Sequence, residues 1–208
     1  MYFTPGYQFA AWRGYCDLPE SRPPQYEPDA VATSGFPMKT ILLLRHAKSS
    51  WDDSSVDDHD RPLNQRGERA ASLVAQFLGH ERLLPEIILC SSARRTRETL
   101  VRVQSVLGDM APVLIERELY LAPEAVLLEH LRKLGDDASC VLVIGHNPGL
   151  EDLAAALIDN KGTAMEEKLA AKFPTAGLAV LRMPIGRWRD LKRHSGSLEL
   201  FVIPKDLV

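Results

Sequence analysis

The stretch Ile-Leu-Leu-Leu-Arg-His at residues 41–46 joins an uninterrupted apolar run to two side chains that can carry positive charge. Four consecutive apolar residues are typical of a strand covered on both faces, as in a parallel sheet flanked by helices. The same pattern, an apolar run followed by polar residues, occurs twice more in the chain. Residues 87–90 are followed by Ser-Ser-Ala-Arg-Arg, and residues 141–144 are followed by Gly-His-Asn-Pro. The sequence therefore predicts three buried strands that each end at polar residues.

The segments around these strands alternate between helical and strand patterns. Apolar residues at helical spacing predict helices over 63–78, 94–107, 123–134 and 150–158. Further apolar runs predict strands over 113–115, 178–183 and 198–203, the last two antiparallel and joined by a polar turn at 186–196. Such alternation favours an α/β sandwich with a mostly parallel sheet.

The composition restricts the class of protein. The 208 residues carry 25 Lys and Arg against 28 Asp and Glu, and 45% are hydrophobic, which fits a soluble globular domain. The net charge of -3 removes the main driving force for nonspecific nucleic-acid binding. No apolar stretch reaches the 18 residues of a membrane span, so neither nucleic acid nor membrane is expected as a partner. Three cysteines cannot form a disulfide framework, and the apolar surroundings of Cys90 and Cys140 predict reduced thiols in a cytoplasmic protein.

The first 37 residues differ from the rest of the chain. They contain six of the 14 prolines and eight aromatic residues, and they show no helical or strand period. They also lack the apolar core of a secretory signal. We predict a poorly ordered leader over residues 1–37 and the folded domain over 38–208, with Met38 as the natural start.

The polar residues that follow the three strands define a candidate site. Ligands of open α/β sheets bind at the carboxyl ends of the parallel strands. If the three strands are neighbours, Arg45, His46, His146 and either Arg95 or Arg94 face one crevice. Arginine and helix N-termini bind anions, so this crevice favours a phosphate group.

Other chemistries have less support in the sequence. Neither a Gly-x-x-x-x-Gly-Lys loop nor a Gly-x-Gly-x-x-Gly motif is present, and no zinc motif occurs. The acidic run at 57–60 is interpreted as a solvated loop, and Asn147 and Pro148 are expected to cap the following helix and aim its amides at the site. The remaining option is covalent phosphoryl transfer with a histidine as nucleophile. The neighbouring arginines would help to keep that histidine neutral.

Four ordered motifs resemble the histidine phosphatase superfamily, and within it the SixA-type phosphohistidine phosphatases. Residues 44–51 (Leu-Arg-His-Ala-Lys-Ser-Ser-Trp) resemble the opening Arg-His-Gly signature, with alanine in place of glycine. Residues 60–67, 91–99 and 145–149 are similar to the three later motifs, the third of them carrying the second histidine. Serine replaces the proline of the family pattern at position 92.

The resemblance implies a fold and a set of roles. The fold would be a three-layer α/β/α sandwich with a mostly parallel central sheet. His46 would accept the phosphoryl group, Arg45, Arg95 and His146 would complete the phosphate pocket, and Ser49 would add a contact. The reaction would need neither metal nor cofactor.

The general acid and the substrate are less defined by the sequence. Glu118 is the first candidate acid and Glu124 the second, while a surface ion pair is an equal interpretation of Glu118. An imidazole leaves more easily than an alkoxide, which favours a phosphohistidine-bearing protein as substrate. A phosphatase or mutase acting on a small phosphorylated molecule and a noncatalytic phosphoprotein-binding module remain as alternatives.

Overall fold

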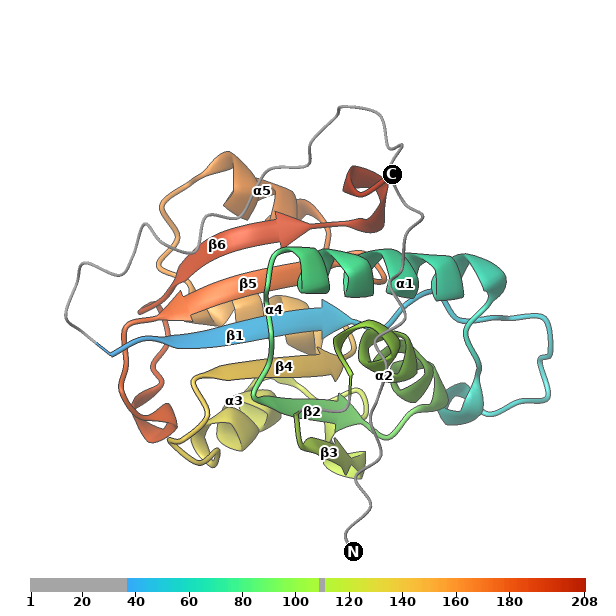
Figure 1. Ribbon diagram of the computed structural model, residues 1–208, viewed down its shortest axis with the longest axis horizontal. Helices are drawn as coiled ribbons and strands as arrows, with labels where there is room; N and C mark the ends of the chain where they lie inside the picture. Colours follow the sequence, from blue (N-terminus) through green and yellow to red (C-terminus); the bar gives the residue numbers. More distant parts are fainter. Residues whose placement is uncertain (1–36, 109–110) are drawn as a thin grey trace, which may run out of the picture.

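The computed structural model describes residues 37–108 and 111–208, so the predicted leader lies outside the described residues apart from Pro37. In these two ranges, six strands and five α-helices follow one another (Figure 1). The strands are β1 (Lys39–Arg45), β2 (Ile87–Ser91), β3 (Val113–Glu116), β4 (Cys140–Gly145), β5 (Leu178–Met183) and β6 (Ser197–Val202). The helices are α1 (Gln65–His80), α2 (Arg94–Leu107), α3 (Glu124–Arg132), α4 (Gly149–Leu157) and α5 (Ala164–Ala171).

The strands form one sheet in the order β3-β2-β4-β1-β5-β6. β1, β2, β3 and β4 run parallel, while β5 is antiparallel to β1 and β6 is antiparallel to β5. Both the mostly parallel sheet and the antiparallel final pair are therefore confirmed. β4 lies between β1 and β2, which brings the carboxyl ends of these three strands side by side.

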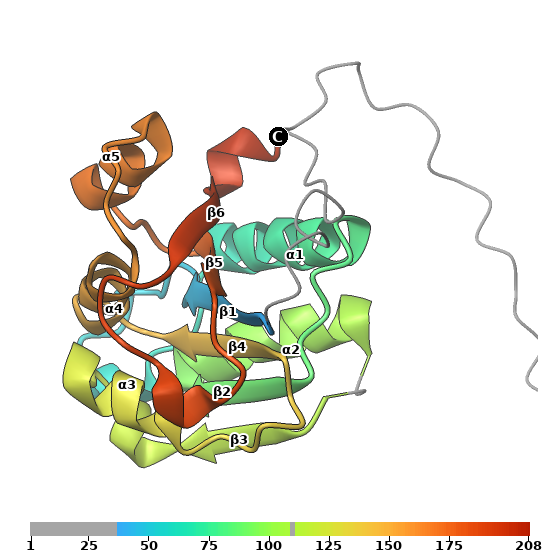
Figure 2. The same ribbon diagram turned by 90° about the vertical axis from the view of Figure 1, so that its left-hand side faces the viewer.

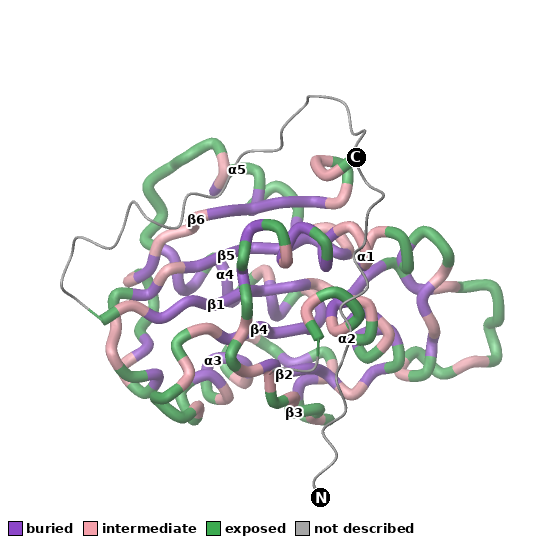
Figure 3. The backbone as a smooth tube through the Cα atoms, in the orientation of Figure 1, coloured by how far each residue is buried: buried purple, intermediate pink, exposed green. Residues whose placement is uncertain are grey.

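Helices cover both faces of the sheet, as the side view shows (Figure 2). Ile41 and Leu43 of β1 point into a core shared with α3, α4 and α5. Leu42 and Leu44 point into a second core shared with α1 and α2. All four side chains are fully buried, because successive strand residues face opposite sides of a sheet that is covered twice. Most of the β1 backbone is accordingly coloured as buried in Figure 3. The α/β/α sandwich is confirmed.

Two segments differ from the sequence prediction. α5 was not predicted, although Thr163 and Glu166 form a capping box at its start, which is a signal that a sequence can show. Residues 186–196 are not a purely polar turn, because Trp188 and Leu191 are fully buried. The indole N–H of Trp188 donates to the Ala138 carbonyl at 2.8 Å, which satisfies its one polar atom inside the core.

Close packing of α1 fixes the loop that follows β1. A side chain at Gly67 would collide with the backbone of Lys48, so only glycine lets α1 approach this loop. The Asn64 side chain caps α1 by accepting from the Gly67 N–H at 2.9 Å, and the Asn64 N–H donates to the Lys48 carbonyl at 2.9 Å. The loop from His46 to Lys48 is therefore held by the helix start.

Candidate functional site

His46 follows β1 directly and is buried. Its Nδ1 lies 2.8 Å from the Ala47 carbonyl oxygen, which can only accept a hydrogen bond, so the neutral ring carries its proton on Nδ1. Its Nε2 therefore holds a lone pair, and it accepts from Nε of Arg95 at 3.3 Å. The Ala47 N–H in turn donates to Oγ1 of Thr99 on α2, which fixes the ring from the backbone side.

His146 follows β4 and lies beside His46, with the two ring centroids 5.1 Å apart. Its Nδ1 is 3.4 Å from Nη2 of Arg95, which can only donate, so Nδ1 is the acceptor. Its Nε2 then donates to Oγ of Ser91, the last residue of β2, at 2.8 Å. The two buried histidines thus both present a lone pair to the same guanidinium.

Arg95 lies in the first turn of α2 and is 4% exposed. Besides both histidines it contacts Asp58: Nη2 is 2.9 Å from Oδ2 of Asp58, and Nη1 donates to the Asp58 carbonyl. Arg94, the preceding residue, is exposed and pairs with Glu98 at 2.7 Å. The structure therefore places Arg95, and not Arg94, beside the histidines, because one residue on a helix is a rotation of about 100°.

Arg45 is the last residue of β1. Its Nη1 donates to the Phe173 carbonyl at 2.7 Å. Its Nε is buried and has no hydrogen-bond partner among the described residues. A buried guanidinium N–H without an acceptor is unfavourable, so this atom favours an anionic ligand.

Burial keeps both histidines neutral. The pKa of His46 is lowered to about 4, chiefly by burial and in smaller part by the charges of Arg95 and Arg45. Burial also lowers the pKa of His146 to about 3, with His46 and Arg95 as the next causes. The arginines help to keep His46 neutral, as expected from the sequence, but desolvation is the larger cause.

These shifts predict how acid affects stability. The pKa of each ring is lower in the folded than in the unfolded protein, so the unfolded state takes up protons first as the pH falls below 6.5. The free energy of unfolding should therefore fall between pH 6.5 and 4, as measured by urea denaturation at several pH values. His46→Gln should flatten this slope, and His80→Gln, at a ring that is 74% exposed, should keep it. An unchanged slope in His46→Gln would contradict the assignment.

Three residues that contact the site were missed by the sequence analysis: Asp58, Ser91 and Tyr120. Asp58 lies in the 3-10 helix η2 (Asp58–Asp60) and is exposed, as expected for a solvated acidic run, but it also contacts the site, which the sequence did not show. Its carboxylate contacts Arg95, Arg61 and the Tyr120 hydroxyl, and these contacts lower its pKa to about 2. The sequence does not show that Asp58 contacts the site, because its partners Arg95 and Tyr120 come from distant segments that meet only in the folded protein.

The predicted helix cap after His146 is also wrong. α4 begins at Gly149 after Pro148, and no side chain caps it. The Asn147 side chain instead donates to Glu151 at 2.7 Å and to the Phe173 carbonyl at 3.0 Å. The Leu150 N–H donates to the His146 carbonyl at 3.0 Å, so this amide holds the His146 backbone and is not free for a ligand.

The remaining predicted residues are Ser49, Glu118 and Glu124, and in the described ranges none of them forms a hydrogen bond or ion pair with the histidine pair. The Ser49 hydroxyl accepts from Nη2 of Arg61 at 2.8 Å. Glu118, in η3 (Arg117–Leu119), is exposed and makes no hydrogen bond or ion pair with the described part of the chain. Glu124 pairs with Arg193 at 2.5 Å at the start of α3. None of these three residues makes a hydrogen bond to His46 within the part of the chain that the structure describes.

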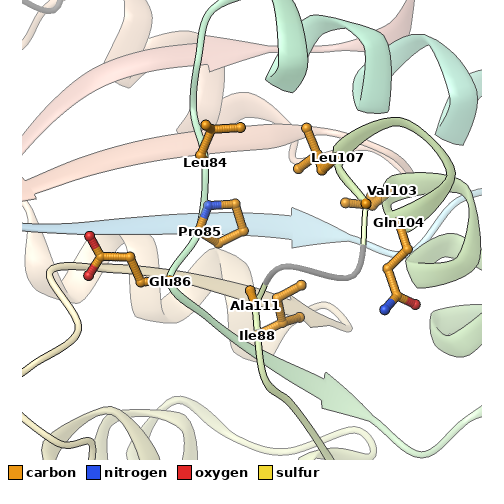
Figure 4. Close-up of a pocket in the computed structure, with 9 residues that line it drawn as sticks. Leu84, Pro85, Glu86, Ile88, Val103, Gln104, Leu107 and Ala111 are labelled. Atoms are coloured by element: carbon orange, nitrogen blue, oxygen red, sulfur yellow. The ribbon is translucent and has the colours of Figure 1, made fainter. Parts of the chain in front are cut away.

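An apolar cavity of about 350 Å³ lies at the other end of the sheet (Figure 4). Its lining comes from the start of β2 and the end of α2, whereas the candidate site lies at the end of β2 and the start of α2. Within residues 37–108 and 111–208, no group of three His, Cys, Asp or Glu side chains is arranged to hold a metal ion. No helix in the same ranges is long and apolar enough to cross a membrane.

Comparison with known proteins identifies the family of this chain. The sequence profile of the histidine phosphatase superfamily (branch 1) matches residues 41–120. An uncharacterised protein of Mycobacterium tuberculosis is 38% identical over 164 residues, which cover 78% of this chain and 100% of the relative.

Solved structures show the same likeness. A Nakamurella multipartitia protein, provisionally named phosphohistidine phosphatase SixA, is 31% identical with a TM-score of 0.71, covering 80% of this chain and 96% of its own. An Agrobacterium tumefaciens protein with the same provisional name is 30% identical with a TM-score of 0.65, covering 80% and 98%.

Proposed function

Because the chain belongs to the SixA-type group of the histidine phosphatase superfamily, we propose that it removes phosphate from protein phosphohistidine without a metal ion. The observation that carries this proposal is the arrangement at His46. A neutral, buried imidazole presents the lone pair of Nε2 to the guanidinium of Arg95, 3.3 Å away. A neutral histidine beside a fixed cation is suited to attack a phosphoryl group and to have the developing charge neutralised.

The proposed reaction has two displacements at phosphorus. In the first, His46 Nε2 attacks, the P–N bond of the substrate breaks, and its electron pair leaves with the imidazole nitrogen. In the second, a water oxygen attacks phospho-His46, the His46–P bond breaks, and its electron pair returns to Nε2 while the water's proton passes to solvent. The released product is inorganic phosphate, and the enzyme returns to its starting state.

Arg45, Arg95 and His146 are the proposed ligands of the phosphoryl oxygens. The buried, unpartnered Nε of Arg45 offers a donor for one oxygen. Arg95 lies between the two histidines, where the charge of the equatorial oxygens would develop. His146 can donate once the phosphate dianion raises its pKa by its own negative charge. Ser49 is proposed as a further contact, which would require its hydroxyl to exchange Arg61 for the ligand.

Glu118 stays the proposed general acid, and its exposed position would let it meet a leaving group at the surface. A phosphohistidine substrate reduces the need for an acid. When the second ring nitrogen of the substrate is protonated, the ring leaves as neutral imidazole. We therefore expect hydrolysis of phosphohistidine to exceed that of alkyl phosphates.

Cytoplasmic signalling through protein phosphohistidine would fit the free thiols of Cys90 and Cys140.

The test compares phosphate release from a phosphohistidine-bearing protein domain and from p-nitrophenyl phosphate, both in the presence of EDTA. Rapid release from the phosphohistidine protein in EDTA supports the proposal. If only p-nitrophenyl phosphate is hydrolysed, the site still acts as a phosphatase, but phosphohistidine is not its substrate. Binding of the phosphohistidine domain without turnover of either compound would instead support a noncatalytic binding module.

A further inference from the structure

Tyr120 extends a row of aromatic rings outward from the histidine pair. Its ring stands nearly perpendicular to that of His146, with centroids 5.4 Å apart, and contacts His59 edge to face at 4.9 Å. The guanidinium carbon of Arg95 lies 5.7 Å from its centroid. His46 and His146 are buried, whereas Tyr120 and His59 are partly exposed. The row therefore connects the phosphoryl site with the solvent.

The Tyr120 ring is held in place from two sides. Its hydroxyl donates to Oδ2 of Asp58 at 2.6 Å, and Asp58 is itself bound by Arg95 and Arg61 at 2.9 Å each. On the backbone side, the Tyr120 N–H donates to the Arg117 carbonyl at 3.0 Å. The next residue, Leu121, has a φ of 51°, a conformation that residues with side chains seldom adopt. A ring fixed in this way can receive a ligand without first being ordered.

Geometry places a leaving group near this ring. A phosphoryl group on His46 would lie among buried side chains, so a leaving group carried by another protein must extend toward the exposed part of the site. Tyr120 and His59 are the rings at that part. Imidazole is a flat aromatic ring, and aromatic rings attract one another in offset-stacked or edge-to-face arrangements.

We propose that Tyr120 contacts the departing imidazole ring and thereby selects phosphohistidine over phosphorylated groups without a ring. This inference rests on the proposed phosphohistidine phosphatase function and adds a specificity residue to it. The contact is made by the ring and not by the hydroxyl. Since the hydroxyl donates to an ionised Asp58, it has no proton to offer a leaving group.

The experiment uses two small compounds that share a P–N bond, phosphohistidine and phosphoramidate, of which only the first carries a ring. Tyr120→Leu should lower kcat/KM for phosphohistidine about tenfold and leave kcat/KM for phosphoramidate within about twofold. Tyr120→Phe keeps the ring and should keep the preference of the wild type.

Each result decides between the inference and its alternatives. An equal loss on both compounds in Tyr120→Leu would overturn the inference, because it would show a general role in holding Asp58 and Arg95. A loss of the preference for phosphohistidine in Tyr120→Phe would show that the hydroxyl and not the ring is responsible, which would also overturn the inference. If the wild-type protein cleaves both compounds without preferring phosphohistidine, the phosphatase activity is supported but the proposed specificity role of Tyr120 is wrong. If the wild type cleaves neither, the proposed function fails first and the inference with it.

Discussion

Replacing His46 with alanine should lower phosphate release from phosphohistidine by at least about 10³-fold and remove the covalent phosphoenzyme. The lone pair on Nε2 is the proposed attacking group, and no other side chain shares its position. In the proposed reaction His146 binds a phosphoryl oxygen, and its Nε2 is engaged with Ser91 at 2.8 Å, so it is not the attacking group. Alanine also leaves a buried site without an imidazole, so folding must be checked separately by thermal unfolding.

The measurement is phosphate release together with trapping of labelled phosphoenzyme by rapid denaturation at alkaline pH, where phosphohistidine is stable. His80→Ala is the matched control, since it removes an exposed histidine at the end of α1. It should keep wild-type activity and the full amount of phosphoenzyme. A folded His46→Ala protein that retained activity in EDTA would end the proposal of a His46 intermediate.

Arg95→Ala is expected to have the second largest effect, a fall in kcat of about 10²–10³-fold, which is typical for loss of one preorganised charge stabiliser. Arg95 is the side chain that joins the two histidines, Asp58 and the face of Tyr120. Its removal takes away a cation from the phosphoryl site and also leaves Asp58 with one arginine partner, Arg61. Both effects weaken the binding of a dianion.

The adjacent arginine offers a control within one turn of helix. Arg94→Ala removes an exposed guanidinium whose partner is Glu98, and it should change kcat by less than about twofold. Arg95→Lys keeps the charge but loses the planar fork, so it should recover only part of the activity. Equal activities of Arg94→Ala and Arg95→Ala in steady-state assays would contradict the placement of Arg95 in the phosphoryl site.

The pattern of the chain was sufficient to predict the layers of the fold. A run such as residues 41–44 has no polar side, which requires cover on both faces, and the structure buries all four side chains completely. Helical spacing predicted the bounds of α2 as Arg94–Leu107, and the apolar run gave β5 as Leu178–Met183. Local periodicity carries this information because burial repeats every two residues in strands and about every 3.6 in helices.

The strand ends also pointed to the site, but only on the condition that three strands are neighbours. Nothing local states that β4 inserts between β1 and β2, and this order is what brings Arg45, His46, Arg95 and His146 together. The choice between Arg94 and Arg95 likewise depended on the resemblance to a family until the structure gave the direction of the α2 face.

The sequence by itself determined which chemistry is available: two histidines and several arginines at the ends of apolar strands. The tertiary structure decided which groups surround them. Asp58 looked like part of a solvated acidic run, Ser91 stood only as the first residue of a family motif, and Tyr120 carried no signal, because each acts on a residue at least 25 positions away. Burial, too, is a property of the packed molecule, and it is burial that lowers the pKa of His46 to about 4 and keeps its Nε2 free to react.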